Sequence, residues 1–403
     1  MKRRVEDLAI FGGPCAFLEP LWVGRPNLGD RERFFDRLGW ALDNRWITNG
    51  GPLVREFELR VADAVEVRNC VATANATTAL QLVLRSLGCT GEVIMPALTF
   101  VATPHAASWL GLDVVFCDVD PETATLDPAA VEAALTERTS AIVGVHLWGR
   151  PCATDLLAKV ASANDVPLIL DAAQAFGATS GGRPIGGFGS AEVFSFHATK
   201  VVNTFEGGAV VTDDDALAAQ IRAMRNFGLD SSGQASMAGV NGKMPESSAA
   251  MGLCSLDAFP ETVAHNELNH DLYRRELDGV RGVRVVEFDR SCRNNFHYLI
   301  VQVDRDVHEL SRDALFEVLR AERIMAQRYF WPGCHQMEPY RSERAVELPN
   351  TEDIGERVLA LPTGPSVSKE DIRRVCDVVA LAVEHGPPIT EKLRSRGRNS
   401  HAN

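Results

Sequence analysis

The sequence has no long apolar run and no secretory leader, and these absences exclude two classes of protein. None of its apolar stretches approaches the roughly 20 residues that a membrane-spanning helix needs. The basic start of the chain is not followed by the apolar stretch and small-residue cleavage site of a secretory signal. We therefore expect a protein of the cytoplasm that does not enter a membrane.

The sequence also lacks a C-x-x-C pair and an excess of positive charge. Its nine cysteines are scattered and odd in number, which argues against a disulfide framework and a zinc ribbon, so we expect reduced thiols and no metal site. The formal net charge of -13 disfavours binding to a nucleic acid. A basic cluster occurs in the tail, residues 387–403, and its Pro, Gly, Ser and Asn neighbours lead us to expect a disordered end.

What the chain does contain is an alternation of helical patterns with short apolar runs, typical of a largely parallel α/β sheet. Residues 77–87 and 154–164 have apolar side chains at helical spacing. The expected strands are residues 92–95, 113–116, 141–145, 167–170, 193–196 and 208–212. In such sheets ligands bind beyond the carboxyl ends of the strands, so the polar residues that follow each run are the candidates for a site.

The length of 403 residues predicts a large domain with a smaller one folded against it. We place an N-terminal segment and the large domain in residues 1–260 and a small α+β domain in residues 261–386. Expected elements of the small domain are strands at 283–287 and 298–302 and helices at 270–277, 312–321 and 371–383. Residues 230–242 are rich in Gly, Ser and Ala and predict a mobile loop.

Lys200 is the first candidate for chemistry. It follows the expected strand at 193–196, where loss of water can lower the pKa of an amine toward nucleophilic values. A lysine in that state can bond covalently to a carbonyl compound such as pyridoxal phosphate (PLP). Taken alone, Lys200 is more simply interpreted as a solvated surface lysine.

Asp171 and Gln174 favour a reactive Lys200 over a surface lysine. Asp171 comes directly after the run that ends at residue 170, and PLP chemistry needs a carboxylate at the pyridine nitrogen. Gln174 is close enough in sequence to reach the phenolic oxygen of the same ring. The alternatives are a helix cap for Asp171 and a plain helix residue for Gln174.

Two further segments fit the same cofactor. Residues 73–78 open a helix with hydroxyl and amide side chains, and a helix N-terminus binds phosphate without basic side chains. Phe100 follows another strand and is placed to stack on a flat ring. The alternatives are an ordinary N-cap and an ordinary core phenylalanine.

These segments together resemble the DegT/StrS group of sugar aminotransferases, which are fold-type I PLP enzymes. The resemblance runs from about residue 41 to 365 through eight ordered pieces. They are W-I-T-N-G-G-P-L-V-R-E-F-E, A-N-A-T-T-A-L, E-V-I-M-P-A-L-T-F, V-G-V-H-L-W-G, L-D-A-A-Q-A-F-G, F-S-F-H-A-T-K, E-G-G-A-V-V-T and V-N-G-K-M.

The resemblance implies a role for each candidate. Lys200 is the lysine that holds the cofactor and moves the proton, Asp171 the partner of the pyridine nitrogen and Gln174 the contact to the phenolic oxygen. Phe100 stacks on the ring.

It also implies a phosphate site and a second subunit. Ala76, Thr77 and Ser195 hold the phosphate, with Asn241 reaching in from another copy, so the resemblance implies a homodimer with shared active sites. His335 matches a histidine near the substrate in the family, and a purely structural histidine is the alternative.

His197, three residues before the lysine, is typical of members that act at C-4 of a sugar. The resemblance therefore implies transfer of the amino group of L-glutamate to C-4 of dTDP-4-dehydro-6-deoxy-D-glucose, in the deoxysugar pathway of a natural product. A C-3 keto-sugar or cyclitol aminotransferase stays open, as does a PLP-binding regulatory protein, although no basic face is present. A PLP dehydratase would lack Lys200, and a nicotinamide dehydrogenase would need a G-x-G-x-x-G after its first strand.

Overall fold

The computed structural model of the protein describes residues 2–230, 232–341 and 346–400. A seven-stranded sheet forms the centre of the large domain, in the order β2-β10-β9-β6-β5-β3-β4. β10 runs antiparallel to both of its neighbours, and the other adjacent pairs are parallel. The strands are β2 (Asn69–Thr73), β3 (Glu92–Pro96), β4 (Asp113–Cys117), β5 (Thr139–Val145), β6 (Leu168–Asp171), β9 (Ala191–Ser195) and β10 (Gly208–Thr212). The expected α/β class with a mostly parallel sheet is confirmed.

The apolar runs form strands because both faces of the sheet are buried. Along β6, Leu168 and Leu170 pack into one apolar cluster and Ile169 into another on the opposite face. Helices cover the sheet: α2 (Pro52–Ala64), α3 (Ala76–Ser86), α4 (Ala102–Ser108), α5 (Pro128–Ala134), α6 (Thr154–Ala163), α7 (Asp215–Met224) and α8 (Glu246–Asp257). An outlying helix, α1 (Arg31–Asp43), packs on α8.

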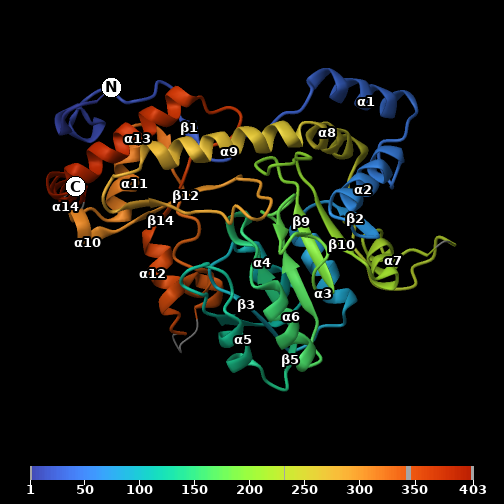
Figure 1. Ribbon diagram of the computed structural model, residues 1–403. Helices are drawn as coiled ribbons and strands as arrows, with labels where there is room; N and C mark the ends of the chain where they lie inside the picture. The colour runs from blue at the N-terminus through green and yellow to red at the C-terminus, as the bar shows by residue number, and fades with distance from the viewer. Residues whose placement is uncertain (1, 231, 342–345, 401–403) are drawn as a thin grey trace.

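The small domain has its own sheet and its own apolar core. β11 (Val283–Val285), β12 (Leu299–Val303) and β14 (Val358–Leu361) pair antiparallel. Its helices are α9 (Phe259–Glu276), α10 (Arg305–His308), α11 (Arg312–Ala321), α12 (Pro349–Arg357), α13 (Lys369–Glu384) and α14 (Gly386–Ser400). In Figure 1, α9 runs across the top of the molecule from the small domain to α8. The expected boundary at residue 260 falls at the start of this helix.

Short elements complete the fold. β1 (Leu21–Trp22) pairs with β13 (Ile324–Met325), and β7 (Thr179–Ser180) pairs with β8 (Arg183–Pro184). Five 3-10 helices are η1 (Val5–Asp7), η2 (Ala9–Phe11), η3 (Leu147–Gly149), η4 (Cys334–Gln336) and η5 (Glu338–Tyr340) in the described ranges.

Both ends of the chain pack differently from our expectation. Leu8 and Ile10 are buried in the apolar core of the small domain, so the N-terminal segment, which we grouped with the large domain, lies against the small one. The tail expected to be disordered forms α14, because Ile389 is fully buried in the same core. Prolines at the first positions of this helix are compatible with helix geometry. Both chain ends lie on the small-domain side in Figure 1; residues 401–403 lie outside the described ranges.

The remaining coarse expectations concern cysteines, metals and membranes. All nine cysteines are free thiols, as expected. In the ranges that the structure describes, no group of three or more His, Cys, Asp or Glu side chains is arranged to hold a metal ion. Nor does any described helix combine the length and apolar character that crossing a membrane requires.

Candidate functional site

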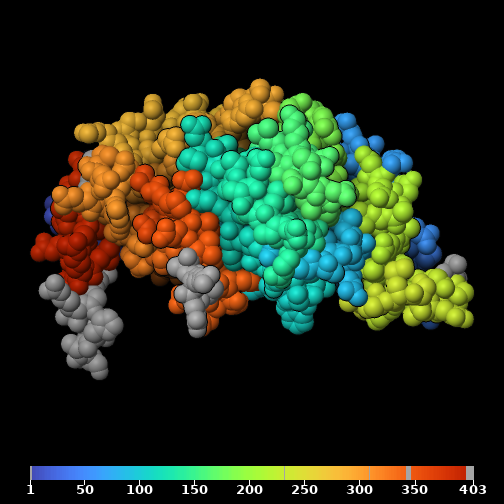
Figure 2. All heavy atoms as spheres, turned by 90° about the horizontal axis from the view of Figure 1, so that it is seen from below, coloured from blue at the N-terminus to red at the C-terminus, as the bar shows by residue number. Residues whose placement is uncertain are grey.

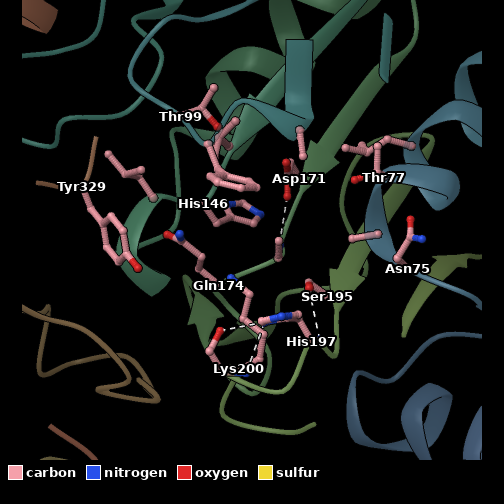
Figure 3. A pocket seen from close by; sticks show the side chains of 18 of the residues that line it. Asn75, Thr77, Thr99, His146, Asp171, Gln174, Ser195, His197, Lys200 and Tyr329 are labelled. Carbon is pink, nitrogen blue, oxygen red and sulfur yellow. Dashed lines mark hydrogen bonds between the residues drawn. The ribbon is translucent and has the colours of Figure 1, made fainter. Parts of the chain in front are cut away.

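A cavity of about 590 Å³ lies at the carboxyl ends of the parallel strands, where the two domains meet. The large domain supplies the residues that end or follow β3, β5, β6 and β9, together with the first turn of α3. The small domain supplies Tyr298, Tyr329 and Phe330. Figure 3 shows the labelled side chains around one hollow.

Seven predicted site residues line this cavity. They are Ala76, Thr77, Phe100, Asp171, Gln174, Ser195 and Lys200. They come from segments as much as 124 residues apart in sequence, numbers 76 to 200, and parallel strand ends bring them together.

Lys200 lies in a turn just beyond β9. The turn is closed by the backbone, since the N–H of Lys200 donates to the carbonyl of His197 at 2.8 Å. Its amine points into the cavity and donates to the hydroxyl of Tyr298 at 3.1 Å. The side chain is half-buried. The interpretation of Lys200 as a solvated surface lysine is therefore wrong.

Asp171 ends β6 and is only 6% exposed. One carboxylate oxygen accepts from the hydroxyl of Thr103 at 2.8 Å, and the other accepts from the backbone N–H of Ala173 at 3.0 Å. Because both of its oxygens are hydrogen-bonded, this buried carboxyl group has a fixed position on the cavity wall. Asp171 is not a helix cap, because no helix follows it directly. Beyond it, Gln174 accepts the N–H of Trp148 at 2.5 Å.

The first turn of α3 faces the same cavity. Asn75 is its N-cap, and its side chain accepts the N–H of Thr78 at 2.8 Å, while Ala76 and Thr77 line the hollow. Glycine is required beside this turn: a Cβ on Gly208 would lie 2.5 Å from the backbone nitrogen of Ala76. The close approach of β10 thus fixes the helix N-terminus, with its free N–H groups, at the cavity.

These residues fit PLP. The cavity presents a primary amine, a buried carboxylate for the pyridine nitrogen and a helix N-terminus for the phosphate. Phe100 lines the cavity and is 59% exposed, which excludes the core phenylalanine alternative.

Two predicted residues are outside this lining. Asn241 pairs through its backbone with Asn226 and is exposed. The yellow-green segment between α7 and α8 projects in part from the body of the molecule in Figures 1 and 2. Asn241 is near its base, since the carbonyl of the next residue, Gly242, accepts from the N–H of Ala74 at 2.7 Å. His335 is buried, with its Nε2 3.3 Å from a carboxylate oxygen of Glu352. Their predicted roles stay predictions.

Sequence reasoning missed the histidine that follows β5. His146 lines the cavity, is fully buried and has its Nε2 3.3 Å from the carboxylate of Glu192. The N–H of Cys152 donates to its Nδ1 at 3.0 Å. The rule that polar residues after strands form the site would have found His146, since it comes directly after residue 145.

The small-domain residues gave no such signal. Tyr298 immediately precedes β12, and its neighbour His297 has its Nε2 2.7 Å from the carbonyl of Thr199. Burial and the charge of Lys200 lower the pKa of His297 to about 4. A neutral ring therefore donates its Nε2 hydrogen to that carbonyl at neutral pH.

His197 and Glu206 also line the cavity, with side chains that are 45% and 68% exposed. The Nε2 of His197 lies 3.6 Å from a carboxylate oxygen of Glu206, and its Nδ1 lies 2.9 Å from the hydroxyl of Thr199. His197 belongs to the turn that carries Lys200, so this pair lies beside the lysine.

The sheet order, the cavity at the strand ends and the set of groups around it define a fold-type I transferase that uses PLP. Comparison with known proteins makes this more specific. The chain belongs to the DegT/DnrJ/EryC1/StrS aminotransferase family, whose model matches residues 29–380. Its members are PLP-dependent sugar aminotransferases, and this enzyme class was the one expected from the sequence.

Individual relatives cover almost the whole chain. The dTDP-4-amino-4,6-dideoxy-D-glucose transaminase of Shigella dysenteriae is 35% identical over 90% of this chain and 98% of its own length. The GDP-perosamine synthase of Caulobacter vibrioides is 35% identical over 88% and 95%. The crystal structure of DesI in the presence of its TDP-sugar product has a TM-score of 0.94 at 55% identity, covering 97% of this chain and 100% of DesI.

Proposed function

We propose that this enzyme transfers the amino group of L-glutamate to C-4 of dTDP-4-dehydro-6-deoxy-D-glucose. The products are 2-oxoglutarate and dTDP-4-amino-4,6-dideoxy-D-glucose, a precursor in the deoxysugar pathway of a natural product. The observation that carries the proposal is the joint placement of Lys200, Asp171 and the α3 N-terminus on one cavity. The choice of sugar rests on the Shigella dysenteriae relative and on DesI, whose names specify a dTDP-sugar transaminase and a TDP-sugar product.

PLP, when bound, supplies an electron sink that makes the α-hydrogen of an amino acid acidic. The amine of Lys200 would bond to the cofactor and, once released, take the proton from Cα of glutamate. Asp171 would keep the pyridine nitrogen protonated, because a buried negative charge favours the cation beside it.

The remaining cavity residues would bind and orient the cofactor. Ala76 and Thr77 would donate backbone N–H groups to the phosphate, and Ser195 would add its hydroxyl. Gln174 would contact the phenolic oxygen, and Phe100 would cover the ring.

The second subunit is part of the proposal. Asn241 is exposed and is not among the residues that line the cavity of its own chain, which is compatible with a role at the phosphate site of another copy. We therefore propose a cytoplasmic homodimer with shared active sites. Substrate contact by His335 would need the substrate to reach a side chain that is buried and is not among the residues that line the cavity.

The test is to identify the product. Purified protein, PLP, L-glutamate and dTDP-4-dehydro-6-deoxy-D-glucose should give an amino sugar whose NMR spectrum places nitrogen at C-4. Lys200→Ala should abolish both turnover and the absorbance of lysine-bound PLP while leaving the fold intact.

Two results would redirect the proposal. If glutamate converts the cofactor but the sugar is not aminated, the reaction with the amino donor stands and the sugar is wrong. The next substrates to assay are then 3-keto sugars, cyclitols and a GDP-linked 4-keto sugar. If neither cofactor binding nor glutamate conversion occurs, the aminotransferase activity itself is wrong, and a regulatory PLP-binding role has no support either.

A further inference from the structure

The small domain contacts the lysine turn through two consecutive residues, His297 and Tyr298. His297 donates to the carbonyl of Thr199 at 2.7 Å, and the hydroxyl of Tyr298 accepts from the amine of Lys200 at 3.1 Å. Residues 297 and 298 thus hold residues 199 and 200 by one contact each. The contact joins the two domains at the side chain that is proposed to bond to the cofactor and move the proton.

Tyr298 is itself well fixed. It is 8% exposed and directly precedes β12, so its backbone is set by the small sheet. Its ring packs edge-to-face on His297, with centroids 4.8 Å apart, and 6.0 Å from the ring of Tyr329. A hydroxyl on such a ring has a defined position, which a mobile side chain or a water molecule does not provide.

Lys200 needs a partner of this kind. Its four-carbon stem carries about 2 kcal/mol of rotamer entropy, so a free amine samples many positions. Within the described residues Lys200 has no ion pair, and the acceptor of its amine is the hydroxyl of Tyr298. The ring centroid lies 5.7 Å from the same nitrogen, so the ring also faces the ammonium group.

We propose that Tyr298 is a positioning residue, whose hydroxyl holds the amine of Lys200 at the point in the cavity where it meets the cofactor and the donor. This inference rests on the proposed function, because it assigns a task to the lysine of that site. It predicts that the hydroxyl, and not the ring alone, sets how fast Lys200 reacts. It also predicts that the small domain must be docked for the lysine to be placed.

The test uses the whole protein freed of cofactor. Tyr298→Phe removes the hydroxyl and keeps the ring; a hydrogen bond to a charged group of typical strength corresponds to about a tenfold to hundredfold change. We expect the rate at which the cofactor-free protein captures PLP, followed by absorbance, to fall by that factor. The maximal rate of the half-reaction with glutamate should fall similarly, while the half-saturating glutamate concentration changes less than about twofold.

Two further variants isolate the hydroxyl. Tyr298→Leu removes ring and hydroxyl together and should be at least as slow as Tyr298→Phe. Tyr273→Phe removes another buried small-domain hydroxyl, one that donates to the carbonyl of Pro362 at 2.8 Å. It controls for loosening of the small domain and should capture PLP at the wild-type rate.

Each contrary result has a separate meaning. If Tyr298→Phe captures PLP and reacts like the wild type, the positioning role is wrong while the aminotransferase stands. If Tyr273→Phe is equally slow, the effect belongs to domain stability and the role of the hydroxyl is again wrong. If the wild type captures no PLP, the proposed function and this inference fail together.

Discussion

The two walls of the cavity are built in different ways. The large-domain wall consists of side chains at strand ends, such as Asp171 and Ser195, and of the first turn of α3. Their positions follow from the sheet, because parallel strands end at one edge. The small-domain wall consists of Tyr298, Tyr329 and Phe330, which reach the cavity only because the two domains are docked.

This difference suggests a division of tasks. The large-domain wall holds the carboxylate of Asp171 and the proposed phosphate site, so it would determine whether the reaction occurs at all. The small-domain wall contributes aromatic rings and one hydrogen bond to Lys200, so it would determine how well the reacting group is placed. Substitutions on the first wall should therefore have larger effects on rate than those on the second.

In the comparison of the two walls, the largest loss of rate should follow substitution of Asp171. Asp171→Asn keeps the shape of the side chain but removes its charge, and we expect the rate of the glutamate half-reaction to fall about a hundredfold to a thousandfold. Thr103→Val is the matched control, because it removes the 2.8 Å hydrogen bond and leaves the carboxylate; about a tenfold loss is expected. An Asp171→Asn enzyme slower than wild type by less than tenfold would remove the proposed division between the walls.

How far the sequence predicts these two walls can be followed residue by residue. Asp171 and Lys200 were found because apolar runs mark strands and polar residues beyond a strand are candidates for a site, whereas Ser195 was implied only by the family resemblance. β2 (Asn69–Thr73) was missed because its run, N-C-V-A-T, has only three apolar residues between polar ones. α14 was missed because composition alone does not show that Ile389 is buried against the small domain.

The rest of the site could not be predicted from the sequence because it depends on how the two domains dock. Residues 298–302 were expected to form a strand, and β12 does form there, but its pattern says nothing of the lysine that Tyr298 contacts. The proposed role of Asn241 would depend in the same way on a second copy of the chain. A pattern in one segment gives its local structure, whereas contacts between domains or subunits depend on surfaces distant in sequence.

His297, which joins the two walls, should make the free energy of unfolding depend on pH. The folded protein holds the pKa of His297 at about 4, below the ordinary value near 6.5. Between these values the unfolded chain binds a proton that the folded protein does not, so the free energy of unfolding falls as the pH falls from about 6.5 to about 4. The loss is at most about 3 kcal/mol, from about 1.4 kcal/mol per pH unit.

Urea unfolding at several pH values measures this contribution. His297→Gln keeps a donor for the carbonyl of Thr199 and removes the titrating group, so its free energy of unfolding should fall less steeply below pH 6.5. Parallel pH profiles for the two proteins would show that His297 is not desolvated, and the small domain would then contact the lysine turn less closely than the 2.7 Å distance indicates.

The smallest effect should come from packing behind the phosphate site. In Gly208→Ala the new Cβ would stand 2.5 Å from the nitrogen of Ala76, so β10 or the start of α3 must move. Overpacking of this kind costs about 1–3 kcal/mol, and if about half of that cost weakens PLP binding, the dissociation constant of PLP rises about twofold to tenfold. Gly187→Ala is the matched control, because its Cβ would meet only Val67, at 3.9 Å. Equal PLP affinity in the two variants would mean that the helix N-terminus tolerates displacement, and the phosphate would then depend more on Ser195 and on the second subunit than on the first turn of α3.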